Sequence, residues 1–282
     1  MKRLLAVVGW IALVVLAGCK QGVLDPKGPI ALAEFQILLD STGIMLAIVI
    51  PTIVATLGVA IWFRASNRRA RYRPDFEHSG RIELLVWAIP IMTVLLVGGV
   101  AWVGSHDLDP KRPIESAAAP VHVQVISLDW KWLFIYPDEG VATVNQLTIP
   151  VGRPVSFGLT GSGVMNSFFV PQLGSQMYTM AGMVTNLNLQ ADHEGTYRGL
   201  SAEFSGEGFA DMRFTVSAVS DGDYAKWLAD THSAGRSLDA NTYTELAKPS
   251  TAVVPTTYGT VAPSFFDIVV QATAAECRGQ RK

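Results

Sequence analysis

The sequence has little charge and little cysteine. Of its 282 residues only 16% are charged, where an average soluble domain carries about 25%, and 49% are hydrophobic. The formal net charge of −2 provides no strongly basic face, which argues against a nucleic-acid-binding protein. The two cysteines, Cys19 and Cys277, are far apart and lie in no CxxC pair, so neither a disulfide scaffold nor a thiolate metal cage is expected. These deficits indicate a membrane protein with a sizeable polar part.

The first apolar run has the form of a signal peptide. Residues 4–16 follow two basic residues, are too few to span a bilayer, and lead into Leu-Ala-Gly-Cys19. This tetrapeptide resembles the lipobox of bacterial lipoproteins, which are cleaved before a cysteine that then carries a diacylglyceryl group. We therefore expect a signal peptide over residues 1–18 and a lipid on Cys19. The alternative is a first membrane helix with an incidental cysteine.

Two further apolar runs are long enough to cross a membrane. Residues 43–63 and residues 84–103 contain no charged side chain. At about 1.5 Å per residue, each run covers the roughly 30 Å of hydrocarbon. Pro51 and Pro90 are tolerated there because neighbouring helices satisfy the disturbed backbone. The sequence predicts two transmembrane helices, preceded by an outer segment over residues 19–42.

The loop predicted between the spans, residues 64–83, fixes the expected orientation. An excess of positive charge in a short loop marks the cytoplasmic side. Both flanks then face outward, which agrees with lipidation of Cys19 on the exported side. We expect an inner-membrane protein of a bacterium, with its N-terminus and its C-terminal domain in the periplasm. The basic residues of the loop are Arg64, Arg68, Arg69, Arg71, Arg73 and Arg81, and the acidic ones are Asp75, Glu77 and Glu83.

Residues 104–220 are predicted to form an all-β sandwich. Valines alternate with other side chains over residues 121–125, and aromatic side chains do so over residues 130–134, as expected of short strands. Many short strands separated by turn residues are typical of a sandwich or a barrel. Further strands are expected at residues 146–149, 154–160, 167–170, 184–190, 195–199 and 212–219.

Residues 221–282 are predicted to form a helical and extended tail. Asp221 or Asp223 is expected to cap a helix that runs through Trp227, and a second helix is expected around residues 241–247. Beyond Pro249 the composition favours an extended strap, with Phe265 and Phe266 as docking residues.

The segment 197–212, with the sequence YRGLSAEFSGEGFADM, carries the strongest functional signal. Together with the two spans and the sandwich, it resembles subunit II of the haem-copper respiratory oxidases, which has two spans followed by a cupredoxin-like domain. In the cytochrome c oxidase branch this loop has the pattern C-x3-C-x3-H-x2-M, and an upstream histidine in an H-S-F context completes a dinuclear copper centre. Two soft thiolates bridge the coppers, imidazoles cap them, and a thioether tunes the potential.

Here the spacing of that pattern is kept, but its ligands are replaced. A carbonyl oxygen and one thioether cannot hold two coppers without the bridging sulfurs. The resemblance is therefore to the quinol oxidase branch of the cytochrome bo type, and we expect no metal or other cofactor in this chain. The positions of the vestigial copper ligands are Asn166, Ser201, Glu203, Ser205, Phe209 and Met212, of which only Glu203 and Met212 keep the pattern.

The resemblance also implies partners and one proton-uptake residue. Subunit I of such an oxidase holds the haems and a single copper, oxidises quinol and reduces dioxygen to water, and subunit III and a small subunit IV complete the complex. Family members have a glutamate before W-x-x-P at the mouth of a proton channel, where this sequence has Glu83. By itself, a carboxylate there is more often a charge that complements the helix dipole.

Other interpretations remain open from the residues alone. One is a copper-bearing, electron-accepting subunit of a cytochrome c oxidase, and another is a stand-alone membrane-anchored lipoprotein that shares only the fold. Trp130, Lys131 and Trp132 match an aromatic stretch that accepts electrons in copper-bearing relatives. Without copper, we expect them to fill the sandwich or to pack on a partner. The histidines are scattered singly and are expected to lie on the surface or in packing positions.

Overall fold

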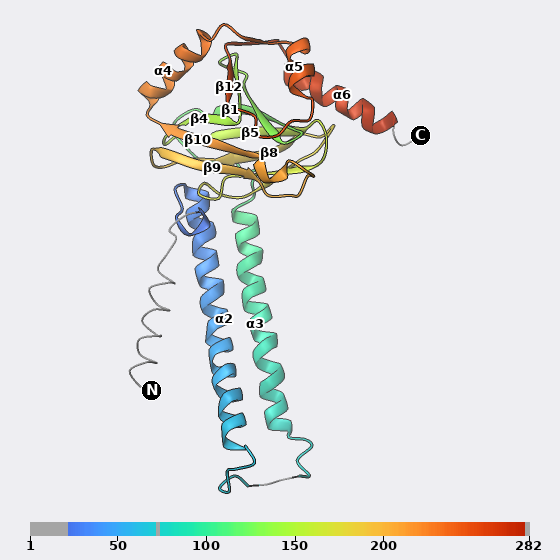
Figure 1. The fold of residues 1–282 in the computed structure, drawn as a ribbon. Helices are drawn as coiled ribbons and strands as arrows, with labels where there is room; N and C mark the ends of the chain where they lie inside the picture. Colours follow the sequence, from blue (N-terminus) through green and yellow to red (C-terminus); the bar gives the residue numbers. More distant parts are fainter. Residues whose placement is uncertain (1–21, 72–73, 280–282) are drawn as a thin grey trace, which may run out of the picture. The chain divides into compact units, whose positions relative to one another are not determined.

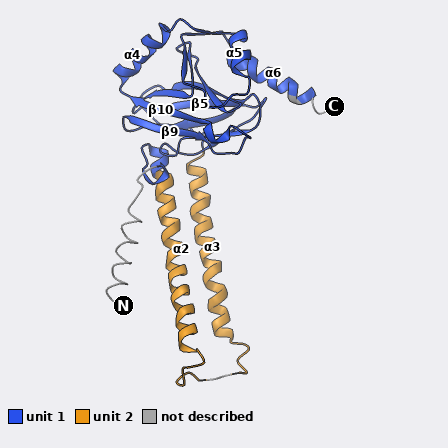
Figure 2. Cartoon of the chain, viewed as in Figure 1, with its two compact units in different colours: residues 1–32, 110–282 blue, residues 33–109 orange. Residues whose placement is uncertain are grey.

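The computed structural model describes residues 22–71 and 74–279. The predicted signal peptide over residues 1–18 and its lipid site Cys19 lie outside the described residues. The chain divides into two compact units, which Figure 2 shows in blue and orange. One unit comprises residues 1–32 and 110–282, and the other comprises residues 33–109.

Two long helices form the hairpin of residues 33–109. Helix α2 runs over Pro29–Trp62 and helix α3 over Gly80–Asp107, and both are long and apolar enough to cross a membrane. Each helix is longer than the predicted span within it. The segment expected as an outer stretch over residues 19–42 is helical from Pro29 onward, because Pro suits the first helical position and the Ala, Leu, Glu and Gln that follow favour helix.

The helices of the hairpin approach closely at one point. A Cβ atom added at Gly104 would lie 2.6 Å from Ile37 Cδ1, so the glycine lets the Ile37 side chain pack against the α3 backbone. Such small residues commonly mark contacts between membrane helices. Gly98 and Gly99 on the same helix have nothing within 4 Å of the corresponding position.

The larger unit is built around two β-sheets, as the sandwich prediction required (Figure 1). A six-stranded sheet has the order β12-β3-β2-β1-β5-β8, and a five-stranded sheet has the order β4-β10-β9-β6-β7. The strands are β1 (Val121–Leu128), β2 (Lys131–Tyr136), β3 (Val141–Val144), β4 (Gln146–Pro150), β5 (Val155–Gly161), β6 (Asn166–Phe169), β7 (Met177–Thr179), β8 (Thr185–Leu189), β9 (Gly195–Ser201), β10 (Arg213–Val219) and β12 (Thr256–Tyr258). Strands β3 and β7 were not expected, because each is too short to show a clear alternation.

Alternation along β2 divides its side chains between two apolar cores. Trp132 and Phe134 enter the core shared by the two sheets, where the ring of Trp132 lies 5.5 Å from that of Phe168. Leu133 and Ile135 point to the opposite face and belong to a second core that includes side chains from the C-terminal tail. The expectation that the tryptophan at position 132 fills the sandwich is therefore confirmed, since its side chain is fully buried.

The tail after the sandwich begins with two helices near the predicted positions. Helix α4 spans Asp221–His232, and its N-cap is Ser220, whose Oγ accepts a hydrogen bond from Asp223 N at 3.2 Å. The proposed caps Asp221 and Asp223 instead lie in the first turn. Helix α5 spans Ala240–Leu246, close to the predicted 241–247.

The rest of the tail is less extended than the sequence suggested. Strands β11 (Ser237–Leu238) and β13 (Thr260–Val261) pair with each other, and helix α6 covers Phe265–Gly279. The prediction of an extended strap is wrong for this last segment, because Phe265, Val269 and Thr273 recur every four residues and bury one helical face. Docking of the phenylalanines at 265 and 266 is confirmed, since both are buried in the second core.

Candidate functional site

The positions predicted to be vestigial ligand positions meet where β6 and β9 lie side by side. Phe168 on β6 pairs with Ser201, the last residue of β9, and this register brings Asn166 close to Ser201. Ser201 Oγ donates a hydrogen bond to Asn166 Oδ1 at 3.0 Å, and Asn166 Nδ2 donates to Val164 O at 2.9 Å. Both side chains are buried, so each polar group finds its partner within the protein.

The second half of the cluster lies in the loop that connects β9 to β10. Ser205 Oγ lies 3.9 Å from Met212 Sδ and donates a weak hydrogen bond to the thioether. Met212 is buried, and Ser205 O accepts a hydrogen bond from Trp130 Nε1 at 3.1 Å. The hydroxyls at 201 and 205 are therefore used in internal contacts.

The last two of the six positions, Glu203 and Phe209, contribute a backbone oxygen and an aromatic ring. Glu203 takes part through its backbone, because its carbonyl oxygen lies 3.2 Å from Ser201 Oγ and shares the single proton of that hydroxyl with Asn166 Oδ1. Phe209 lies in the short 3-10 helix η2 (Phe209–Asp211), and its ring packs edge-on against Phe204, with 5.5 Å between the centroids. Phe204 is itself 72% exposed, so this end of the loop presents an aromatic surface to the outside.

A dinuclear copper centre does not fit these donors. Asn166, Ser201 and Ser205 offer neutral oxygen and nitrogen atoms, Phe209 offers no donor, and Met212 offers a single thioether. Copper in such a centre needs thiolates and imidazoles, which neutral hydroxyls and an amide do not replace. Among residues 22–71 and 74–279, no group of three or more His, Cys, Asp or Glu side chains is placed to hold a metal ion.

The proposed proton-uptake residue Glu83 lies in the first turn of α3. Its Oε1 is 2.5 Å from His78 Nδ1, and the two side chains are 52% and 68% exposed, respectively. His78 had been expected to be an isolated surface histidine, and the contact with Glu83 was missed. The spacing of His78 and Glu83 could have indicated this contact, because the side chain of a residue just before a helix can reach the first turn. His122 likewise contacts an acid, Asp138, at 2.8 Å.

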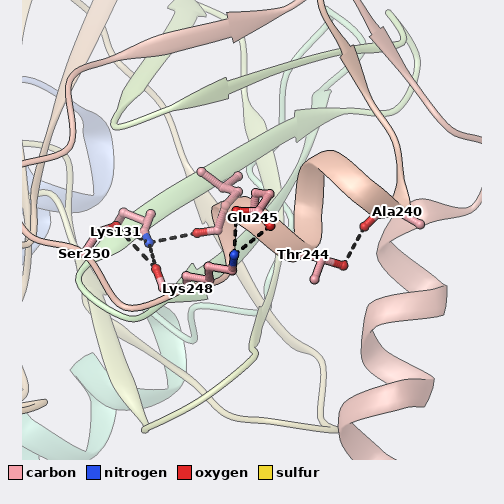
Figure 3. A network of polar contacts seen from close by, with 7 residues as sticks. Lys131, Ala240, Thr244, Glu245, Lys248 and Ser250 are labelled. Atoms are coloured by element: carbon pink, nitrogen blue, oxygen red, sulfur yellow. Dashed lines mark hydrogen bonds and ion pairs between the residues drawn. The ribbon is translucent and has the colours of Figure 1, made fainter.

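Lys131 is the most deeply buried charged residue of the sandwich. Its side chain is 1% exposed, and its Nζ donates three hydrogen bonds, one to the last residue of α5 and two to the segment that follows (Figure 3). Burial lowers the pKa of the Lys131 ammonium, and the carboxylate of Asp129 opposes that shift. The sequence did not single out this residue as more than part of an aromatic stretch.

Comparison with known proteins assigns the family. Residues 139–219 match the profile of the periplasmic domain of cytochrome c oxidase subunit II, and residues 232–272 match the profile called COX aromatic rich motif. The chain therefore falls in the class of oxidase second subunits, with a membrane hairpin and a sandwich of that type.

Relatives that match most of the chain show which branch of the oxidase second subunits it resembles. Cytochrome bo(3) ubiquinol oxidase subunit 2 of Pseudomonas aeruginosa is 45% identical over 280 residues, which cover 98% of this chain and 84% of the relative. Ubiquinol oxidase subunit 2 of Acetobacter aceti is 46% identical over 264 residues, covering 93% and 86% of the two chains. Quinol oxidase subunit 2 of Bacillus cereus is 37% identical over 240 residues, covering 84% and 82%. The chain belongs to the quinol oxidase subunit 2 family, which confirms the resemblance found in the sequence.

Proposed function

We propose that this chain is subunit II of a proton-translocating quinol oxidase and carries no copper centre of its own. The observation that carries the proposal is the closed cluster at the vestigial ligand positions. Ser201 and Asn166 bond to each other, and Ser205 bonds to Met212, so these groups stabilise the loop in place of binding a metal. Electrons from quinol would then enter the complex without passing through this chain.

The partners follow from the family. Subunit I would hold the haems and the single copper, oxidise quinol and reduce dioxygen to water, and subunit III and a small subunit IV would complete the complex. This chain would brace subunit I with α2 and α3 and cover its outer face with the sandwich. The exposed Phe204 and the apolar outer surface of both helices supply contact area for such a partner.

The proposed topology places the arginine-rich loop in the cytoplasm and the sandwich in the periplasm. This orientation rests on the charge of the loop and on the lipobox. Mass spectrometry of the mature chain tests the anchor. We expect an N-terminus at Cys19 that carries a diacylglyceryl group, and an unmodified chain that begins at Met1 would refute the lipid anchor.

Glu83 is proposed to take up protons at the cytoplasmic side. Its carboxylate is half exposed at the start of α3 and touches His78, so it has access to water and a second titratable group beside it. Groups of this kind relay protons effectively when they lie within hydrogen-bond reach of each other.

Purification of the complex through a tag on this chain tests the main proposal. We expect haem and a single copper in the preparation, and turnover with a quinol but not with cytochrome c. The Ser201→Ala/Ser205→Ala double variant is the matched control, and its copper content should equal that of the wild type. Additional copper that is lost in this variant, together with activity toward cytochrome c, would contradict the proposal.

A further inference from the structure

The C-terminal extension sends a strap, defined as residues 246–253, back to the sandwich. Lys131, the first residue of β2, fastens this strap at three points (Figure 3). Its Nζ donates to Leu246 O at 2.8 Å, to Lys248 O at 2.6 Å and to Ser250 Oγ at 2.7 Å. An ammonium group has three donors, so the strap satisfies all of them.

The fastening is strong because the charge is buried. Burying an ammonium group is costly unless oxygen atoms surround it, and here every surrounding acceptor belongs to the strap or to the end of α5. Leu246 O is the last helical carbonyl of α5, where unpaired carbonyls and the helix dipole favour a cation. Displacement of the strap would remove all three of these hydrogen-bond acceptors from the Lys131 ammonium.

A second side chain holds the far end of the strap. Asn145 Nδ2 donates to Val253 O at 2.9 Å, while Asn145 Oδ1 accepts from Trp132 N at 2.9 Å. Both fastenings therefore start from residues at the ends of β2 and β3. The strap is therefore fixed at each end to the same end of the β2–β3 pair in the six-stranded sheet.

Between these two points the strap meets the loop that contains the vestigial ligand positions. A Cβ atom added at Gly208 would lie 2.4 Å from Cδ2 of Trp130 and 2.7 Å from Cγ2 of Thr251. Trp130 also donates from its indole nitrogen to Ser205 O. The indole, the loop and the strap thus form one continuous contact around the glycine.

We propose that the strap, pinned by Lys131, is a closing device that holds the Trp130 indole on Gly208 and so fixes the loop 201–212. Sequence-distant parts of the chain are coupled in this way, because the loop packs correctly only when the strap is seated. The coupling must be reciprocal, so a change in the loop at Gly208 should also loosen the strap. This inference goes beyond the proposed function and does not depend on the identity of the electron donor.

Hydrogen–deuterium exchange of the purified complex tests the device. In the Lys131→Met variant we expect amide exchange in peptides from residues 246–253 and from residues 201–212 to accelerate by about tenfold or more, as loss of a charged hydrogen-bond network predicts. The loop offers suitable reporters, since Ser201 N donates to Met212 O and Asp211 N donates to Gly208 O. Peptides from β5 should be unchanged.

The matched control is Lys248→Met. Lys248 Nζ forms an ion pair with the exposed carboxylate of Glu245. Removing the Lys248 ammonium therefore changes the net charge by the same amount, but it removes none of the three hydrogen bonds of Lys131. We expect wild-type exchange in both peptides. Equal acceleration in Lys248→Met, or acceleration spread evenly through the sandwich in Lys131→Met, would overturn the proposal.

Two milder variants keep the test decisive if Lys131→Met yields too little folded complex. Ser250→Ala removes one of the three acceptors and should accelerate exchange in the strap and the loop severalfold. Gly208→Ala acts from the loop side and should accelerate exchange in the strap. A strap that loosens in Ser250→Ala while the loop stays protected would show that the strap does not hold the loop.

Discussion

Ser201 Oγ donates a hydrogen bond to Asn166 Oδ1 across 3.0 Å, although the two residues are 35 positions apart in the chain. Both residues stand at positions that the sequence predicts to correspond to copper ligands in copper-bearing relatives. A neutral hydrogen bond joins the two strands at these positions.

This contact predicts the cost of removing the hydroxyl. In Ser201→Ala, Asn166 Oδ1 becomes a buried acceptor without this donor, and we expect the free energy of unfolding to fall by about 1–3 kcal/mol. Chemical denaturation of the full chain in detergent, followed by circular dichroism of the sandwich, measures the change. Ser217→Ala on β10 is the control and should shift the free energy of unfolding by less than about 0.5 kcal/mol. Equal stability of the two variants would refute the structural role of Ser201.

Glu83 is expected to affect proton delivery in the assembled oxidase. Glu83→Gln keeps the shape of the side chain but cannot carry a proton, so we expect oxygen consumption with quinol to fall by at least about tenfold. Oxygen-electrode turnover and proton pumping in reconstituted vesicles measure the effect. Glu77→Gln, in the loop just before α3 and also exposed, is the matched control and should retain full turnover. Unchanged turnover and pumping in Glu83→Gln would remove this residue from the proton path.

Tyr136 predicts how the sandwich responds to high pH. Burial raises the pKa of Tyr136 well above its ordinary value, and its OH donates to Thr148 O at 2.9 Å. Because the pKa is raised in the folded state, the phenol stabilises the fold fully below about pH 10 and progressively less above it, at about 1.4 kcal/mol per pH unit. Absorbance of tyrosinate near 295 nm, measured against pH on the purified chain, should rise together with unfolding.

The Tyr136→Phe variant separates this effect from general alkaline damage. It should be less stable at neutral pH, because Thr148 N loses its acceptor, but its stability should fall less steeply with pH. A wild-type slope in this variant would show that another group controls alkaline unfolding. Ionisation of Tyr136 in the still-folded protein would contradict the prediction more directly.

Gly199 is predicted to be irreplaceable in β9. A Cβ atom added there would lie 2.1 Å from ring atoms of Phe214, which is buried in the main core. The ring cannot move without disturbing its stacking on Phe168, at 5.0 Å between centroids, so Gly199→Ala should cost about 1–3 kcal/mol.

Gly158 on β5 offers a matched control for Gly199. An added Cβ would meet only Val184 Cγ1, at 4.0 Å, so Gly158→Ala should be neutral or slightly stabilising. Thermal unfolding of both variants measures the difference. Similar melting temperatures would mean that the core can adapt to the extra methyl group at Gly199.

Periodicity predicted most of the architecture because it reports directly on burial. Strands such as β1 and β5 show the apolar pattern of the surface they bury, and the spans at 43–63 and 84–103 show the unbroken apolar length of a membrane helix. Helix α6 was missed since it buries a single face with side chains, such as Val269, that also favour strands. The local composition of this segment favours an extended chain, but packing of one face against the second core stabilises a helix.

The candidate site was predictable as a set of positions but not as a set of contacts. The spacing of Ser201, Ser205 and Met212 located the loop and showed which ligands were missing. Which hydroxyl would bond to which partner depends on the register of β6 and β9, and no local pattern encodes that register. The role of Lys131 was hidden for the same reason, since its three acceptors lie more than 110 residues further along the chain.

Strand β12 gives the tail a further role during biogenesis. It pairs antiparallel with β3, with Thr257 opposite Thr143, and so occupies a sheet edge whose open backbone groups would otherwise be free to recruit another chain. Because β12 follows β3 only after the second sheet and helices α4 and α5, the edge of β3 stays open until that part of the chain has been synthesised. Between synthesis of β3 and synthesis of β12, this edge is therefore open to pairing with another chain.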